Sequence, residues 1–231
     1  MKIVLIGGTG GLGKALALRW CLKHSIIIGS RVGEKAIDSA HKYDLEARRH
    51  YGSHMSGNIK GMSNDEAVKI AEILVLTIPY QNVLEISKNL KRELPTDSLI
   101  ISPVVPMIRN SRGFSYSPPH TYNSKLGSGK MVSIAEAISN ELPSHIVVSG
   151  FHTIPEKLLA NLSLEINMDV FLTSDDIEAA TKVSKLVKEI PGLRPIYVGQ
   201  LEVSSLVECM TPLLLNISKN NDIKNPSIKI I

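Results

Sequence analysis

The chain has 231 residues, 43% hydrophobic and 21% charged, which is ordinary for a globular protein and excludes a chain that is mainly disordered. Lysine and arginine number 26 against 22 aspartates and glutamates, and no dense run of like charges occurs, so we expect no nucleic-acid partner. No apolar run reaches the roughly 18 residues that a membrane helix needs, so we expect no membrane partner either.

Strand-like and helix-like segments alternate through the first hundred residues. Buried apolar runs predict the strands, and apolar residues at helical spacing predict the helices between them. This order is typical of an α/β protein with a doubly wound parallel sheet and helices on both of its faces. Residues 53–60 are small and polar and are predicted to form a loop. In chain order we predict strand 2–6, helix 12–22, strand 25–29, helix 34–51, a short helix capped by Ser63, strand 72–78, helix 81–94 and strand 98–102.

The pattern changes in the second half of the chain. Residues 103–130 show no regular periodicity, and loops of that length are functional or mobile. We place a domain boundary near residue 150, with a larger domain over 1–150 and a small α+β domain over 151–231. Beyond the long loop we predict helix 132–142, strand 145–151, strand 168–172, helix 175–189, strand 195–198 and helix 203–219.

The chain has two cysteines, Cys21 and Cys209, which lie far apart and lack metal-type spacing. We therefore expect free thiols and no metal site. Few cysteines fit a reducing cytoplasm. The chain also opens directly into a predicted strand, without a signal-peptide pattern, so we expect a cytoplasmic protein.

A glycine-rich stretch, "GGTGGLG" at residues 7–13, follows the first strand and opens the first helix. Gly8, Gly10 and Gly13 fit G-x-G-x-x-G in the structural context that this motif requires. The glycines allow a tight turn, a close approach of the backbone to a pyrophosphate, and close helix–strand packing. A plain glycine turn is the alternative. We favour dinucleotide binding by residues 1–150, with Thr9 and the backbone of Gly10, Gly11 and Leu12 around the phosphates.

The end of the second strand indicates which dinucleotide binds. NAD-binding chains usually carry an acidic residue there, which accepts hydrogen bonds from the ribose 2′-hydroxyl. Here the strand ends in Ser30 and Arg31, with Lys35 four residues further on. Arg31 is suited to a forked, charge-assisted contact with a 2′-phosphate. The alternative is a solvated surface pair, and we favour NADP(H) over NAD(H).

The motifs "LIGGTGGLGKALALR", "GSR", "VLTIPY", "ISPVVP", "RGFSYS", "HTIPEKLLANL" and "VECMTPLLLNI" resemble the NADPH-dependent F420 reductases, nearly from end to end. The resemblance implies hydride transfer between NADP(H) and the deazaflavin coenzyme F420. It also implies a Rossmann domain followed by a small C-terminal domain that completes the F420 pocket, and a homodimer.

The resemblance also implies site residues, most of them at the carboxyl ends of predicted strands. The family often has a second basic residue after the arginine of the 2′-phosphate site, where this chain has Val32. Residues 116–130 look longer than the family's usual connection; they are either a surface insertion or a segment that alters access to the F420 side. The implied cofactor-binding residues are Thr9, Gly10, Gly11, Leu12, Ser30, Arg31, Lys35, Ile78, Tyr80, Leu84, Val105, His152 and Glu156.

Direct ring-to-ring hydride transfer needs two stacked rings in a dry pocket and no acid–base dyad. The sequence offers no Ser/His/Asp arrangement and no Tyr-x-x-x-Lys pair, so we assign no catalytic residue. His152 is a proton donor or, more simply, a strand-end histidine bonded to the backbone. Arg109 and Arg112 either contact an anionic F420 tail or are solvated, and Glu208 is expected to be a buried, paired carboxylate.

The helix predicted at 203–219 is apolar on more than one face, which is typical of a surface that meets a partner. A second copy of the chain is the natural candidate, and packing against the first domain is the alternative. The apolar tail that starts at Asn225 is a candidate to fold back over the cofactor site. Two other functions stay open: an NADP(H)-dependent reductase of another acceptor (a flavin, a metal ion or a carbonyl or imine compound), and a non-enzymatic NADP(H) redox sensor.

Overall fold

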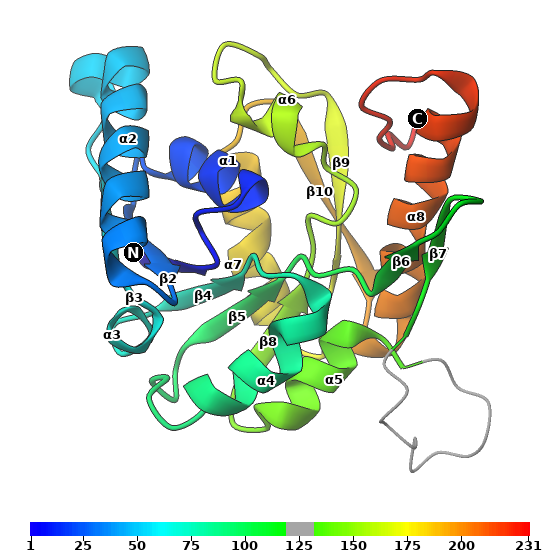
Figure 1. Ribbon diagram of the computed structural model, residues 1–231, viewed down its shortest axis with the longest axis horizontal. Helices are drawn as coiled ribbons and strands as arrows, with labels where there is room; N and C mark the ends of the chain where they lie inside the picture. Colours follow the sequence, from blue (N-terminus) through cyan, green and yellow to red (C-terminus); the bar gives the residue numbers. More distant parts are fainter. Residues whose placement is uncertain (119–131) are drawn as a thin grey trace.

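The computed structural model describes residues 1–118 and 132–231. Its centre is an eight-stranded sheet in the order β10-β9-β8-β5-β4-β1-β2-β3 (Figure 1). The strands from β3 to β8 run parallel, which confirms the predicted doubly wound arrangement. The strands of this sheet are β1 (Lys2–Ile6), β2 (Ser25–Ser30), β3 (Asn58–Ser63), β4 (Ile73–Leu76), β5 (Leu99–Ser102), β8 (Ile146–Ser149), β9 (Met168–Thr173) and β10 (Leu193–Gly199).

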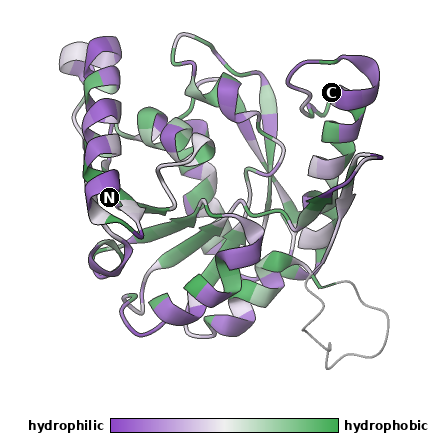
Figure 2. Cartoon of the chain, viewed as in Figure 1, coloured by the Kyte–Doolittle hydropathy of each residue, from purple (hydrophilic) through white to green (hydrophobic). Residues whose placement is uncertain are grey.

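Helices cover both faces of the sheet because the strands bury side chains on both. On β1, Ile3 and Leu5 join the apolar cluster beneath α1, α2, α6 and α7, whereas Val4 and Ile6 join the cluster beneath α3, α4 and α5. In Figure 2 the central strands are green and the exposed α2 is mostly purple. The helices are α1 (Gly11–Trp20), α2 (Gly33–Tyr51), α3 (Asn64–Val68), α4 (Tyr80–Leu90), α5 (Ile134–Glu141), α6 (Glu156–Ala160), α7 (Ile177–Lys188) and α8 (Ser204–Asn221).

The predicted loop at 53–60 is wrong in its second part, because β3 begins at Asn58 and pairs in parallel with β2. An edge strand covered mainly by α2 needs little apolar sequence, and Ile59 is its one buried residue. Gly61 packs directly against the backbone of α2 at Ala36, where a side chain would collide. The polar composition of β3 is therefore why the sequence did not predict this strand. The predicted helix cap at Ser63 is confirmed, because Ser63 forms a reciprocal capping box with Glu66.

The predicted irregular region 103–130 contains a hairpin, β6 (Met107–Arg109) paired antiparallel with β7 (Phe114–Tyr116). Strands of three residues are too short to show an alternating pattern in sequence, which is why this region was predicted to be irregular. Asn216 of α8 holds the hairpin by accepting from Phe114 N at 2.9 Å and donating to Phe114 O at 2.7 Å. Most of the 116–130 stretch that looks long for the family lies outside the described residues.

Beyond residue 150 the chain extends the same sheet. β9 meets β8 antiparallel through one register pair, Ser149 with Thr173, and β10 then runs parallel to β9. The division into domains at residue 150 stays a prediction. Among the described residues no helix combines the length and the apolar character needed to cross a membrane.

Candidate functional site

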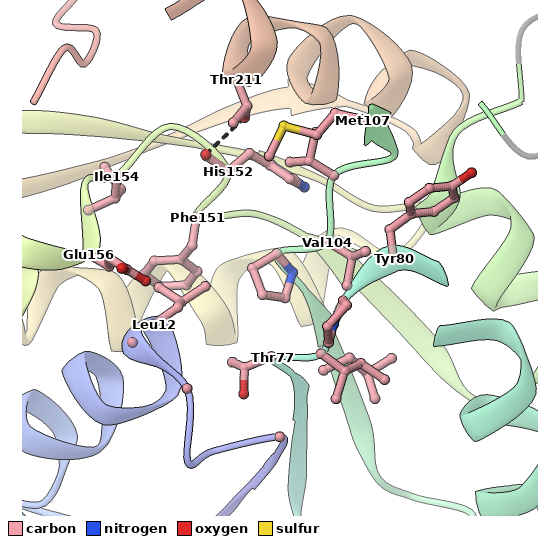
Figure 3. A pocket seen from close by; sticks show the side chains of 18 of the residues that line it. Leu12, Thr77, Tyr80, Val104, Met107, Phe151, His152, Ile154, Glu156 and Thr211 are labelled. Atoms are coloured by element: carbon pink, nitrogen blue, oxygen red, sulfur yellow. Dashed lines mark hydrogen bonds between the residues drawn. The ribbon is translucent and has the colours of Figure 1, made fainter. Parts of the chain in front are cut away.

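A cleft of about 980 Å³ opens where the strands β1, β2, β4, β5 and β8 end at their carboxyl termini. Ligands of open α/β sheets bind at this edge, because the strand order reverses there and leaves a crevice between the loops. Figure 3 shows side chains from several elements around the cleft, among them Leu12, Thr77, Tyr80 and His152. Helix α8 and the C-terminal tail close its far side through Thr211, Leu214, Leu215, Ser218, Asn225 and Pro226.

The glycine loop forms one wall of the cleft. Gly7 adopts a φ of +77°, and a side chain there would lie 2.7 Å from Thr77 O of the neighbouring strand end. A side chain at Gly13 would lie 2.5 Å from Gly8 Cα, so α1 sits directly on the loop. α1 begins at Gly11 with no side-chain cap and no acidic residue in its first turn. Its first N–H groups and its dipole therefore face the cleft, where they suit an anion.

The predicted basic residues Arg31 and Lys35 line the cleft together with Ser30. Ser30 Oγ accepts from Val32 N at 3.3 Å, and in the described part of the chain neither basic side chain forms an ion pair. Asn64, which was not predicted, joins them with a buried Oδ1 that lacks a hydrogen-bond partner. Residue 64 follows β3, so its place beside the end of β2 could be predicted only once β3 was recognised.

The end of β4 supplies the middle of the cleft. Ile78 and Tyr80 line it as expected, and Thr77, not predicted, lines it while its Oγ1 donates to Ile6 O at 2.9 Å. Leu84 does not belong to the lining: it packs against the apolar cluster beneath α4. Tyr80 and Leu84 share one face of α4 and both pack against that cluster, but only Tyr80 also reaches the cleft.

His152 lies in the cleft just after β8 and is 8% exposed. Its Nε2 is 3.3 Å from Ser149 Oγ, and its backbone O accepts from Thr211 Oγ1 at 2.9 Å (Figure 3). Burial lowers the pKa of His152 to about 4, although a backbone hydrogen bond at Ser102 opposes the shift. The imidazole is therefore neutral at pH 7, and its buried Nδ1 has no partner. A neutral ring suits a hydrogen bond to a ligand and does not supply a positive charge.

Most of the predicted site residues meet in this one cleft, and the remaining candidates lie elsewhere. Arg109, Arg112 and Glu208 are not part of the lining, and Glu208 is the buried, paired carboxylate that was expected. Among the described residues no group of three His, Cys, Asp or Glu is arranged to hold a metal ion. The predicted residues that line the cleft are Thr9, Gly10, Gly11, Leu12, Ser30, Arg31, Lys35, Ile78, Tyr80, Val105, His152 and Glu156.

Residues 2–106 match the family described as NADP oxidoreductase, coenzyme F420-dependent. Over its whole length the chain is 34% identical to the F420-dependent NADP reductase of Methanocaldococcus jannaschii, covering 98% of that protein. The chain belongs to this family. The F420-dependent NADP reductase of Methanothermobacter marburgensis, a further member, is 31% identical with the same coverage.

A solved structure supports the fold independently of sequence. The putative F420-dependent NADP reductase of Arthrobacter sp. FB24 superposes with a TM-score of 0.76, covering 100% of this chain and 98% of that one. Its sequence is 18% identical, so this likeness shows the fold alone.

Proposed function

We propose that this protein is an oxidoreductase that transfers a hydride between NADP(H) and coenzyme F420. The relatives that are 31–34% identical along the full chain are named for that activity, and this is the observation that carries the proposal. The cleft supports it, because the glycine loop and the α8 side face one continuous space of about 980 Å³. Two large cofactors that react with each other need such a shared space.

The two ends of the cleft suggest which cofactor lies where. The pyrophosphate of NADP(H) is assigned to the backbone of Gly10, Gly11 and Leu12, and its 2′-phosphate to Ser30, Arg31 and Lys35. Asn64 lines the same end with a buried, unpaired Oδ1, which can accept from a ribose hydroxyl and not from the phosphate. F420 is assigned to the opposite end, between the strand ends at Val105 and His152 and helix α8.

The reaction we propose is direct transfer from C4 of the nicotinamide to C5 of the deazaflavin. The C4–H bond of NADPH breaks and the C5–H bond of the deazaflavin forms, and the deazaflavin takes up one proton from the solvent to give reduced F420 and NADP⁺. The protein supplies orientation and a dry space. Apolar walls from Val104, Ile154 and Phe151 serve this purpose, and each of these side chains is buried. Neutral His152 is placed to hydrogen-bond a ring or its amide rather than to act as a cation.

The first prediction is that purified protein mixed with NADPH bleaches the absorbance of oxidised F420 in a stopped-flow instrument near neutral pH. NADH should be much less effective, because it lacks the phosphate that Arg31 is assigned to hold. Intact NADPH binding without bleaching would reject F420 as acceptor and leave a reductase of another acceptor or a redox sensor.

Arg31→Ala tests the assignment of the 2′-phosphate site. Loss of a charge-assisted hydrogen bond typically costs about tenfold or more in affinity, so NADPH binding should weaken by that factor while NADH binding stays unchanged. Arg49→Ala removes the same charge from an exposed position late in α2 and should leave both affinities as they are. Equal losses for NADPH and NADH in Arg31→Ala would reject the 2′-phosphate assignment.

We also propose a homodimer and a cytoplasmic location. Leu206 and Leu213 of α8 are 61% and 58% exposed and lie seven residues apart, on one stripe of the helix. Cys21 and Cys209 are both free thiols, as is usual in a reducing compartment.

A further inference from the structure

The side chain of Glu156 lies directly over the glycine loop. A side chain built at Gly11 would meet Oε1 of Glu156 at 2.7 Å, and it would meet Oε2 more closely still. Gly11 is the first residue of α1, at the end that offers free N–H groups to an anion. A negatively charged group of the protein therefore lies where the phosphate-binding backbone is most exposed. The resemblance to the family implied a cofactor role for Glu156, but not this position at the glycine loop.

In the described part of the chain no group pairs with the carboxylate of Glu156 and draws it away from the glycine loop. Within the described residues Glu156 forms no hydrogen bond or ion pair, and Lys157, the next residue and also part of the lining, does not pair with it. Gly11 N and the other free amides of α1 do not hydrogen-bond it either. The carboxylate lies near the loop without being held by it.

The backbone beneath Glu156 is held firmly against α1. Arg19, 5% exposed, donates from Nε to Leu159 O at 2.9 Å, and from Nη2 to Asn161 O at 2.7 Å and Leu164 O at 3.0 Å. Leu159 is completely buried in the cluster beneath α1. These contacts hold the end of α6 and the residues after it against α1, and the first residue of α6, Glu156, lies beside the first residue of α1, Gly11.

We propose that Glu156 sets the affinity of the cleft for the pyrophosphate of the dinucleotide, by repelling it and by occupying part of the space in front of Gly11. This inference rests on the proposed assignment of the glycine loop to NADP(H). The pyrophosphate approaches the loop most closely at the glycines, because no side chain stands between them and the ligand. A carboxylate there opposes an anion through like charge and must swing aside when the dinucleotide enters. The consequence is a faster release of the nucleotide than the bare loop would allow.

Glu156→Gln tests the proposal, because it removes the charge and keeps the shape of the side chain. NADPH is titrated by its fluorescence, with no F420 present, at low ionic strength and again in 0.5 M salt. We expect the Kd for NADPH to fall roughly three- to tenfold at low salt, and the gain to shrink in high salt, because screening weakens repulsion between charges. Glu156→Ala, which also clears the space, should bind at least as tightly as Glu156→Gln.

Glu165→Gln is the matched control, since it removes the same charge from an exposed residue beyond the end of α6. Its affinity for NADPH should equal that of the wild type. Inorganic pyrophosphate, used as a competitor of NADPH, should show the same gain in Glu156→Gln, which locates the effect at the phosphates. An unchanged or weaker affinity in Glu156→Gln would overturn the proposal, and a weaker one would make Glu156 an acceptor for the cofactor.

The test separates this proposal from the proposed function. Tighter NADPH binding in Glu156→Gln together with no bleaching of F420 would support the role of Glu156 and reject the acceptor. Bleaching of F420 together with an unchanged NADPH affinity in Glu156→Gln would support F420 as the acceptor and reject the role of Glu156. No NADPH binding by any variant would overturn both.

Discussion

Glu208 is a carboxylate of α8 with no exposed surface. It accepts from Tyr116 Oη at 2.7 Å, from Ile134 N at 3.1 Å and from Ala135 N at 3.2 Å. It therefore joins three elements, the β6–β7 hairpin, the start of α5 and α8. Burial raises the pKa of Glu208 to about 7, although these hydrogen bonds oppose the shift. The residue is a structural link at the back of the cleft wall, outside the lining itself.

The pKa of Glu208 makes stability depend on pH. The folded protein keeps a proton up to about pH 7 that the unfolded chain releases near pH 4.5, so this stabilisation is complete below pH 4.5 and is lost as pH rises through 7. Glu208→Gln cannot titrate. Relative to it, the free energy of unfolding of the wild type should fall by roughly 2–3 kcal/mol between pH 5 and 8. Urea denaturation at both pH values measures this, and identical pH dependence in the two proteins would contradict it.

At the scale of elements, the C-terminal tail is the segment whose path matters most for the cleft. α8 ends at Asn221, and the next residue, Asp222, adopts a left-handed conformation with a φ of +51°, which turns the chain back. Asn225 and Pro226 then line the cleft, as the sequence suggested, and Ser227 Oγ donates to Thr153 O at 3.0 Å. The tail is thus a wall of the cleft at the end assigned to F420.

Asp169 of β9 anchors the end of this tail. It is fully buried, and it accepts from Ile230 N at 2.6 Å and pairs with Arg194 and Lys229. Its backbone N also donates to Ile228 O at 3.0 Å. The hydrogen bonds from Arg194 lower the pKa of Asp169 to about 2, so the anchor is charged at every physiological pH.

Asp169→Asn should release the tail without touching the glycine loop. We expect KM for F420 to rise several-fold, because buried charge pairs are costly to break and the freed segment forms that side of the cleft. The Kd for NADPH should stay within twofold of the wild type. A truncation after Ser227 removes the anchored residues and leaves Asp169. It should likewise raise KM for F420 and leave the Kd for NADPH unchanged. Equal weakening of both cofactors in the two variants would show a general loss of structure instead.

At the scale of the whole molecule, the exposed apolar stripe of α8 predicts self-association. In a dimer with twofold symmetry each chain would bury its two exposed leucines against the other chain, and this burial would stabilise the dimer. Sedimentation equilibrium should give about twice the 25.2 kDa of one chain. Leu206→Glu combined with Leu213→Glu should give the monomer, whereas Ile177→Glu, at a residue of α7 that is 57% exposed, should leave the dimer intact. A wild-type protein that sediments as a monomer would refute the prediction.

The central strands could be predicted because their signals are local. Within the first thirty residues, the apolar run Lys2–Ile6 predicts a buried strand, the glycines after it predict a turn, and the isoleucines of β2 predict a second strand. β3 was missed because its neighbours, not its own side chains, make it a strand: α2 covers it and β2 pairs with it. The β6–β7 hairpin was missed because Asn216, about a hundred residues away, holds it.

By itself the sequence determined the central strands, the glycine loop and the basic residues at the end of β2, because each depends on residues that are close together in the chain. Only the tertiary structure decided what closes the cleft: Asn64 beside Ser30, Glu156 over Gly11, and α8 with the tail along the far side. These neighbours are separated by tens to hundreds of residues. Their meeting depends on packing contacts such as those of Arg19 with α6 and of Asp169 with the tail, and no local pattern in the sequence encodes such contacts.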